Sequence, residues 1–147
     1  MQQLNFPAYT FRFKSSENKI LIFDEIRKKF VRLTPEEWVR QHVIQFLIHQ
    51  KKYPKTLISV EKRITVAQLN KRYDIVVYTP EGDIQLLVEC KAPEVTVSQE
   101  VFDQTARYNL LLKADYLMVT NGLQHYYCMM DYENQKYIFK KQLPDFQ

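Results

Sequence analysis

The sequence predicts a mixed α/β fold in which a central β-sheet is flanked by α-helices. Short apolar runs bounded by turn residues are typical of strands, and two stretches with apolar residues at helical spacing interrupt them. The order along the chain is strands, helix, three strands, helix and then more strands. The chain has 147 residues, 46% of them hydrophobic, which fits one domain with a substantial core.

The first 33 residues are expected to form an N-terminal β-hairpin extension, because strand-like runs alternate there with polar turns. The core of the domain is expected over residues 34–130, and residues 131–147 would add a C-terminal strand and a tail. The strands expected in the extension are "YTFRF" at 9–13, "KILIF" at 19–23 and "FVRL" at 30–33.

The stretch "LTPEEW" marks the start of the first helix. Thr34 is a good N-cap, Pro35 suits the first helical position, and Glu37 completes a capping box with Thr34. The helix is expected to run to about Gln50, where "KKYPKT" ends it. Its buried face is predicted from the residues at helical spacing, which are Trp38, Val39, His42, Val43, Phe46 and Leu47.

Three strands are expected next, at 57–64, 72–78 and 84–91. The last two are joined by "TPEGD", in which Pro80 fits the second and Gly82 the fourth position of a type I turn, so they form a hairpin. A second capping box, from Thr96 to Gln99, then predicts a helix over roughly 97–113. The remaining strands are expected at 115–120, 124–130 and 136–140.

Charge and composition exclude several classes of protein. The net charge of +4 and the pI of 9.0 are mildly basic, which permits a nucleic-acid partner without requiring one. The two glycines, Gly82 and Gly122, are too few for a Walker A loop or a dinucleotide-binding motif, so no nucleotide site is expected. No apolar run is long enough for a membrane span, and the N-terminus lacks the features of a signal peptide. Cys90 and Cys128 form no disulfide framework or zinc motif, so a cytoplasmic protein with reduced thiols is expected.

A candidate site lies at the ends of the predicted hairpin strands. In "LLVECKAP", Glu89 and Lys91 share one face, because the side chains of a strand alternate. If the hairpin loop is the four residues 80–83, Asp74 lies directly opposite Glu89, with Cβ atoms about 5 Å apart. Two opposed carboxylates repel each other unless a cation lies between them. Oxygen ligands at this separation suit Mg²⁺, and Lys91 would reach a water or phosphate beside the metal.

Two alternatives remain open at this site. A three-residue loop with a glycine bulge would shift the pairing by one residue and oppose Asp74 to Val88. Asp74 could also form a structural ion pair with Arg72 or Lys91, and Glu89 could pair with Lys91. Each residue alone carries no functional signal, and only their combination in a hairpin that follows a capped helix favours a site.

Asp74 followed by "VECKAP" resembles the PD-(D/E)xK nuclease motif, with Tyr73 at the position of the proline that names it. More narrowly, residues 20–130 are similar to the N-terminal nuclease domain of type I restriction enzyme R subunits. Gln104 and Tyr108 match the Q-x-x-x-Y motif of that branch, and their spacing places both on one helix face; a partly buried face with Tyr108 packed on the sheet would give the same spacing. The segments that carry the resemblance are "LTPEEWVRQ", "YDIVVY", "LLVECKAP", "FDQTARYN" and "LMVTNG".

The resemblance implies a restriction-endonuclease-like fold and a metal-dependent DNA endonuclease-like domain that hydrolyses phosphodiester bonds. Asp74, Glu89 and the backbone carbonyl of Cys90 would hold Mg²⁺, for which Mn²⁺ could substitute. Lys91 would orient the attacking water or stabilise charge on the phosphoryl oxygens.

The resemblance also assigns roles to residues on the two helices. Gln104 and Tyr108 would position Lys91 or the DNA backbone. An acidic residue of the first helix is implied at the site, with Glu37 as the first choice and Glu36 as the second. The capping box and the helix dipole also explain both glutamates.

DNA is the expected partner, with short basic clusters supplying phosphate affinity that does not depend on sequence. A motor or specificity subunit is a second expected partner. Two other functions stay open, a non-cleaving nucleic-acid-binding module and an accessory subunit of a larger restriction or repair complex. The basic clusters are residues 27–29, 51–52, 62–63 and 71–72.

Overall fold

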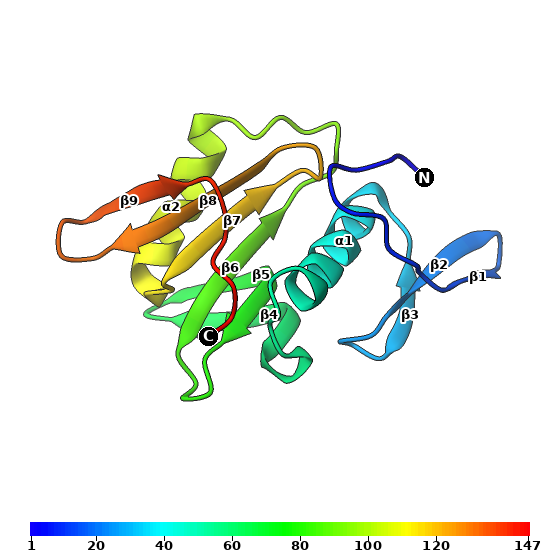
Figure 1. Ribbon diagram of the computed structural model, residues 1–147, viewed down its shortest axis with the longest axis horizontal. Helices are drawn as coiled ribbons and strands as arrows, with labels where there is room; N and C mark the ends of the chain where they lie inside the picture. The colour runs from blue at the N-terminus through cyan, green and yellow to red at the C-terminus, as the bar shows by residue number, and fades with distance from the viewer.

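Two β-sheets and two α-helices make up the computed structural model, which describes residues 1–147 (Figure 1). The smaller sheet is antiparallel and has the order β1-β2-β3. Its strands are β1 (Phe13–Ser16), β2 (Lys19–Asp24) and β3 (Lys29–Arg32). The predicted N-terminal extension is therefore a three-stranded sheet rather than a hairpin alone.

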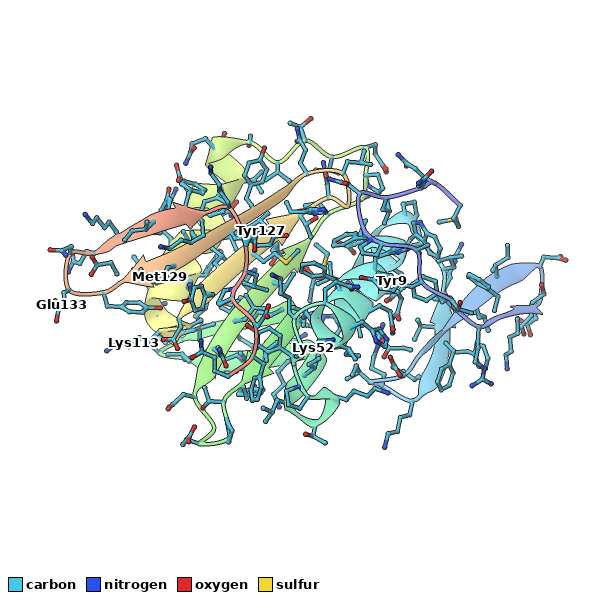
Figure 2. The ribbon with its side chains drawn as sticks, viewed as in Figure 1. Tyr9, Lys52, Lys113, Tyr127, Met129 and Glu133 are labelled. Carbon is cyan, nitrogen blue, oxygen red and sulfur yellow. The ribbon has the colours of Figure 1, made fainter.

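The first strand begins later than predicted, because the aromatic run before it packs on helix α1 (Pro35–His49). Residues 9–13 were expected as a strand, whereas β1 begins at Phe13. The rings of Tyr9 and Phe11 lie 5.9 and 5.0 Å from the ring of His42, and Figure 2 shows Tyr9 beside the helix. Helix packing therefore takes the place of strand pairing in this run.

Helix α1 starts where the sequence predicts. Thr34 has an extended backbone, and its hydroxyl accepts a hydrogen bond of 3.0 Å from the amide of Glu37. The reciprocal half of the predicted capping box is not formed, because the Glu37 carboxylate turns to Arg27 and Arg40 instead. Glu37 therefore contributes to the cap only through its amide.

The larger sheet has the order β4-β5-β6-β7-β8-β9. Strands β6 and β7 are parallel, and all other neighbours are antiparallel. Helix α2 (Gln99–Leu112) forms the crossover between the two parallel strands. The bounds are a 3₁₀ turn at Lys55–Leu57, then β4 (Ile58–Val66), β5 (Leu69–Tyr78), β6 (Ile84–Cys90), β7 (Tyr116–Thr120), β8 (His125–Asp131) and β9 (Lys136–Lys140).

Each face of the larger sheet carries one hydrophobic cluster, covered by one helix (Figure 1). On one face, Val39 and Val43 of α1 pack with Val88 of β6. On the other face, Phe102 of α2 packs with Leu87 of the same strand. The predicted mixed α/β fold with a central sheet flanked by helices is confirmed. Neither helix has the length and apolar character that a membrane span requires.

Helix α2 begins two residues later than predicted. Its N-cap is Ser98 rather than Thr96, because the Ser98 hydroxyl accepts a hydrogen bond of 3.2 Å from the amide of Val101. The sequence offers two hydroxyl residues within three positions, and the capping-box pattern alone favoured the earlier one.

The β5–β6 hairpin combines the two registers that the sequence left open. A four-residue loop at 80–83 would pair Thr79 with Ile84, but next to the turn Tyr78 pairs with Ile84 instead. A bulge between Val77 and Tyr78 then shifts the register, and Val77 pairs with Leu86. The inner part of the hairpin therefore has the register that was predicted from a four-residue loop.

Candidate active site

Asp74 and Glu89 lie on neighbouring strands at the same end of the β5–β6 hairpin. The inner register, continued by one residue beyond its last pair, places Asp74 across from Glu89. The partners of Asp74 are the amide of Cys90, which donates to Oδ2 at 2.8 Å, and Arg40 of α1, whose Nη2 lies 2.7 Å from Oδ1. Both oxygens of this carboxylate are therefore fixed by hydrogen bonds.

A local break in strand alternation turns Asp74 toward α1. Residues two apart in a regular strand share a face, yet Tyr73 belongs to the cluster under α2 and Ile75 to the cluster under α1. The β4–β5 ladder leaves out the pair of Glu61 with Asp74, and Glu61 has a left-handed backbone with φ of 52°. This distortion allows Asp74 to reach Arg40.

Glu89 is held by two lysines. Lys91 Nζ lies 3.8 Å from Oε1, and Lys71 Nζ lies 3.3 Å from Oε2. Lys71 also lies over two aromatic rings, 4.5 Å from the centroid of Tyr73 and 5.1 Å from that of Tyr108. Lys71, which the sequence placed only in a basic cluster at residues 71–72, therefore links Glu89 to helix α2.

The acidic groups of the site repel one another. Burial, and next the negative charge of Asp74, raise the pKa of Glu89 above its ordinary value, although Lys71 and Lys91 act in the opposite direction. The same two causes raise the pKa of Glu36. An additional positive charge among these carboxylates would therefore be favourable.

Replacing Glu89 with Gln is expected to stabilise the metal-free protein at neutral pH. A carboxyl whose pKa is raised by folding binds its proton more tightly in the folded state, so stability falls as pH rises from the ordinary pKa through the raised one. The uncharged amide removes this loss. Thermal unfolding in EDTA should give Glu89→Gln a higher Tm than the wild type at pH 7, and the two proteins should converge below pH 4.5, the ordinary value for this group. A lower Tm for the variant at pH 7 would contradict the repulsion described above.

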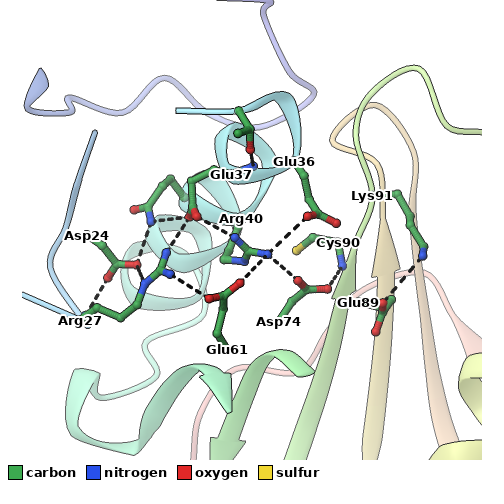
Figure 3. Close-up of polar contacts among 12 residues, drawn as sticks. Asp24, Arg27, Glu36, Glu37, Arg40, Glu61, Asp74, Glu89, Cys90 and Lys91 are labelled. Atoms are coloured by element: carbon green, nitrogen blue, oxygen red, sulfur yellow. Dashed lines mark hydrogen bonds and ion pairs between the residues drawn. The ribbon is translucent and has the colours of Figure 1, made fainter. Parts of the chain in front are cut away.

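The two glutamates at the start of α1 have different surroundings (Figure 3). The side chain of Glu36 is 48% exposed, its carboxylate lies 3.6 Å from Arg40 Nη2, and Figure 3 shows it pointing toward the region of Asp74. The side chain of Glu37 is 7% exposed, and its two oxygens bind Arg27 and Arg40. Arg40 lies between Glu37 and Asp74, so Glu36, the second choice from sequence, is the glutamate on the open side of the site.

Glu37 belongs to a network of ion pairs that connects strand β2 with Asp74 through α1 (Figure 3). Its closest pairs have N–O distances of 2.7 or 2.8 Å. The members are Asp24, Arg27, Glu37, Arg40, Glu61 and Asp74, and Glu36 joins them at the exposed edge through Arg40. Burial would lower the pKa of Arg40, but the charges of Asp74 and Glu37 outweigh it and raise that pKa, so the guanidinium stays charged.

Three other predicted residues take distinct places. Tyr108 is half-buried and packs against Lys71, and Gln104 is exposed one turn earlier on α2. Cys90 is buried with a free thiol whose pKa burial raises, so it can offer the site its backbone carbonyl but not a thiolate. No group of three or more His, Cys, Asp or Glu side chains is arranged to hold a metal ion.

Comparison with protein families matches residues 35–144 to the N terminus of type I restriction enzyme R proteins (HSDR_N). The chain belongs to this family. The matched range covers both helices and the six-stranded sheet of this HSDR_N domain, whereas the sheet β1–β3 precedes it. No curated protein matches the sequence.

A solved structure has the same fold as this HSDR_N domain. It is a fragment described as the HsdR subunit of a type I restriction enzyme from Vibrio vulnificus YJ016, with 20% sequence identity and a TM-score of 0.52. The similarity covers 77% of this chain and 24% of that chain, so the HSDR_N domain spans about a quarter of the length of that protein.

The sequence did not indicate Arg40 as part of the site, and it indicated Lys71 only as a member of a basic cluster and not as a partner of Glu89. Arg40 lies four residues after Glu36 and three after Glu37, a spacing that places all three on one helix face. That spacing indicates local ion pairs but not the contact with Asp74, which depends on the packing of α1 on the sheet. No local signal indicates the contact of Lys71 with Glu89, because it joins separate strands.

Proposed function

We propose that this chain is a metal-dependent DNA endonuclease domain of the PD-(D/E)xK type. The observation that carries the proposal is the proximity of Asp74, in the middle of β5, to Glu89 and Lys91 at the end of β6, beside Glu36 at the start of α1. Membership of the HSDR_N family supports it, because that family is found at the N terminus of type I restriction R proteins.

The donor atoms of the site fit Mg²⁺. Asp74, Glu89 and the carbonyl of Cys90 offer hard oxygen ligands, and Mg²⁺ characteristically binds one or two carboxylates while keeping waters for substrate phosphates. Two carboxylates with a backbone carbonyl agree with the lack of a cluster of three metal-binding side chains. When bound, the ion would polarise the scissile phosphate and lower the pKa of a coordinated water.

The surrounding residues would orient these ligands and stabilise charge. The Cys90 amide and Arg40 hold the Asp74 carboxylate in one orientation, and Lys71 does the same for Glu89. Lys91 would stabilise negative charge on the phosphoryl oxygens.

Glu36 would accept a proton from the attacking water. Its carboxylate is half-exposed at the open side of the site, and its raised pKa suits a general base. Tyr108 would act through Lys71, on which its ring packs, and Gln104 is exposed where it would contact the DNA backbone. We further propose that the domain works with a motor or specificity subunit.

The proposal is tested by incubating linear and circular DNA with the protein in Mg²⁺, Mn²⁺ or EDTA. Cleavage is expected with either metal and not with EDTA, and Asp74→Ala should abolish it. Binding of Mg²⁺ measured by calorimetry should weaken in the same variant. Arg72→Ala, which removes an exposed side chain from the same strand, is the control and should leave Mg²⁺ binding unchanged.

Cleavage that persists in Asp74→Ala would refute the site. Mg²⁺ binding that is lost in Asp74→Ala, without cleavage by the wild type, would mean that the isolated domain needs its partner subunit. The absence of both cleavage and Mg²⁺ binding would favour a nucleic-acid-binding module instead.

A further inference from the structure

The net positive charge of the chain is concentrated in residues 1–33. This segment contains seven Lys or Arg and three Asp or Glu residues, so it accounts for the whole net charge of +4, and residues 34–147 are neutral overall. The segment also lies outside residues 35–144, the range matched by the family. Any role of this charge therefore belongs to the sheet β1–β3 rather than to the nuclease-like core.

One face of the sheet β1–β3 is basic. The strand register places Lys14 and Arg32 in one row, on either side of β2. Alternation along the strands puts Arg12 and Lys19 on the same face, and all four side chains are exposed. Asp24 is the one acidic residue within these strands, and it lies on the opposite face. A surface that serves only solubility would be expected to mix both signs of charge.

Aromatic rings hold two of these cations in place. The guanidinium of Arg12 lies 4.6 Å from the ring centroid of Phe23, and the ammonium of Lys14 lies 4.8 Å from that of Phe30. The rings are covered by cations, so the face presents charge rather than free surfaces for base stacking. Ordered cations lose less conformational freedom when they bind an anion.

The opposite face of the same sheet is covered in part, although Phe13 and Ile20 on it are 49% and 55% exposed. Ile22 and Asp24 on that side are fully buried, and Asp24 accepts hydrogen bonds from Arg27 and from Gln41 of α1. The sheet β1–β3 therefore contacts α1 through Asp24, and its basic face is directed to solvent. Arg32 ends β3 two residues before Thr34, the N-cap of the helix whose first turn carries Glu36.

We propose that this basic face, formed by Arg12, Lys14, Lys19 and Arg32, binds the phosphate backbone of DNA. The proposal rests on the proposed function for its choice of polyanion, and it extends the DNA contact beyond the family core. Four exposed cations on one face of an antiparallel sheet, with no acidic residue of its strands on that face, can neutralise phosphates of a nucleic-acid backbone. Such contacts position DNA without reading its sequence.

The test compares two variants with equal loss of charge. One carries Arg12→Gln, Lys14→Gln, Lys19→Gln and Arg32→Gln, and the control carries Lys113→Gln, Lys136→Gln, Lys140→Gln and Lys141→Gln, which are exposed and form no ion pair. Binding of a fluorescent DNA duplex and of one of its single strands is measured by anisotropy in EDTA, so that cleavage does not interfere. Salt is varied from about 50 to about 200 mM, the range over which phosphate contacts change affinity strongly.

The face variant is expected to bind the duplex at least about tenfold more weakly at low salt, with a salt slope reduced by up to about 3.6, or about 0.9 for each lost phosphate contact. The control should lose far less. Equal losses in both variants, or no binding by the wild type at low salt, would overturn the proposal. Loss confined to the single strand would overturn it as well, because backbone contact predicts weakening for both forms.

Two further measurements keep the result unambiguous. Thermal unfolding checks that the face variant is folded, and Lys19→Gln with Arg32→Gln serves as a second variant, because it leaves the cation–ring contacts of Arg12 and Lys14 intact. Retained face-dependent DNA binding by a wild type that neither cleaves DNA nor binds Mg²⁺ would refute the proposed function alone. Cleavage by the wild type with identical DNA binding by the face variant and the control would refute the basic face alone.

Discussion

Replacing Lys91 with Ala should lower the rate of DNA cleavage at saturating Mg²⁺ by about 10²- to 10³-fold, the usual cost of removing one group that stabilises transition-state charge. Replacing Lys71 with Ala should lower it by less than about tenfold. The two lysines contact the same carboxylate, that of Glu89, but they differ in freedom. Lys71 is held by Glu89 at 3.3 Å and by two aromatic rings, whereas Lys91 is 3.8 Å from Glu89 and 33% exposed.

Single-turnover cleavage by the two variants and by the wild type, each titrated with Mg²⁺, provides the measurement. Mg²⁺ affinity should be retained or increased in both variants, because each removes a positive charge from beside Glu89, the proposed ligand. Lys91→Arg keeps the charge and should recover part of the rate. A larger loss in Lys71→Ala than in Lys91→Ala would assign the charge-stabilising role to Lys71 and would reduce Lys91 to an ion-pair partner.

The order of secondary structure was predictable because the signals for it are local. The cap at Thr34 and the turn between β5 and β6 both depend on residues within four positions of each other, and both are found in the structure. Predicted boundaries failed where two local signals competed. Ser98 took the cap that Thr96 was expected to form, and the aromatic rings of residues 9–11 pack on α1 instead of forming a strand.

The strand register that places Asp74 across from Glu89 agrees with the one expected for a four-residue loop, but the loop is not what produces it. Tyr78 pairs with Ile84, which alone would have shifted every later pair, and the bulge beside Val77 restores the predicted register. No glycine marks the position of this bulge in the sequence, so its place was not predictable from local residues.

The surroundings of the site could not be predicted, because they depend on contacts between distant segments. Arg40 reaches Asp74 across 34 residues, and Lys71 reaches Glu89 across 18. The helix acid was predicted as Glu37 with Glu36 second, and the choice between them depends on how α1 rotates on the sheet. In the structure Glu37 is buried and binds Arg27 and Arg40, whereas Glu36 is half-exposed at the open side of the site.

Arg40→Met is expected to lower the free energy of unfolding by about 3 kcal/mol. The side chain of Arg40 is 5% exposed, and its guanidinium neutralises Glu37 and Asp74, whose side chains are 7% and 12% exposed. Without it, both carboxylates remain buried with less positive charge nearby. Arg27 still pairs with Glu37, and the Cys90 amide still donates to Asp74, which keeps the loss at the lower end of the range for broken buried ion pairs.

Urea denaturation at pH 7 measures this loss, with Arg63→Met as the matched control. Arg63 is exposed and forms one weak hydrogen bond of 3.3 Å to Asn70, so its replacement should change stability by no more than about 0.5 kcal/mol. Adding Asp74→Asn to Arg40→Met should restore part of the loss, because it removes one of the two carboxylates left without a full partner. If Arg40→Met unfolds like the control, the network does not stabilise the fold. The close contact of Arg40 with Asp74 would then serve the site alone, by fixing the orientation of a metal ligand, and its loss would appear in Mg²⁺ affinity instead of in stability.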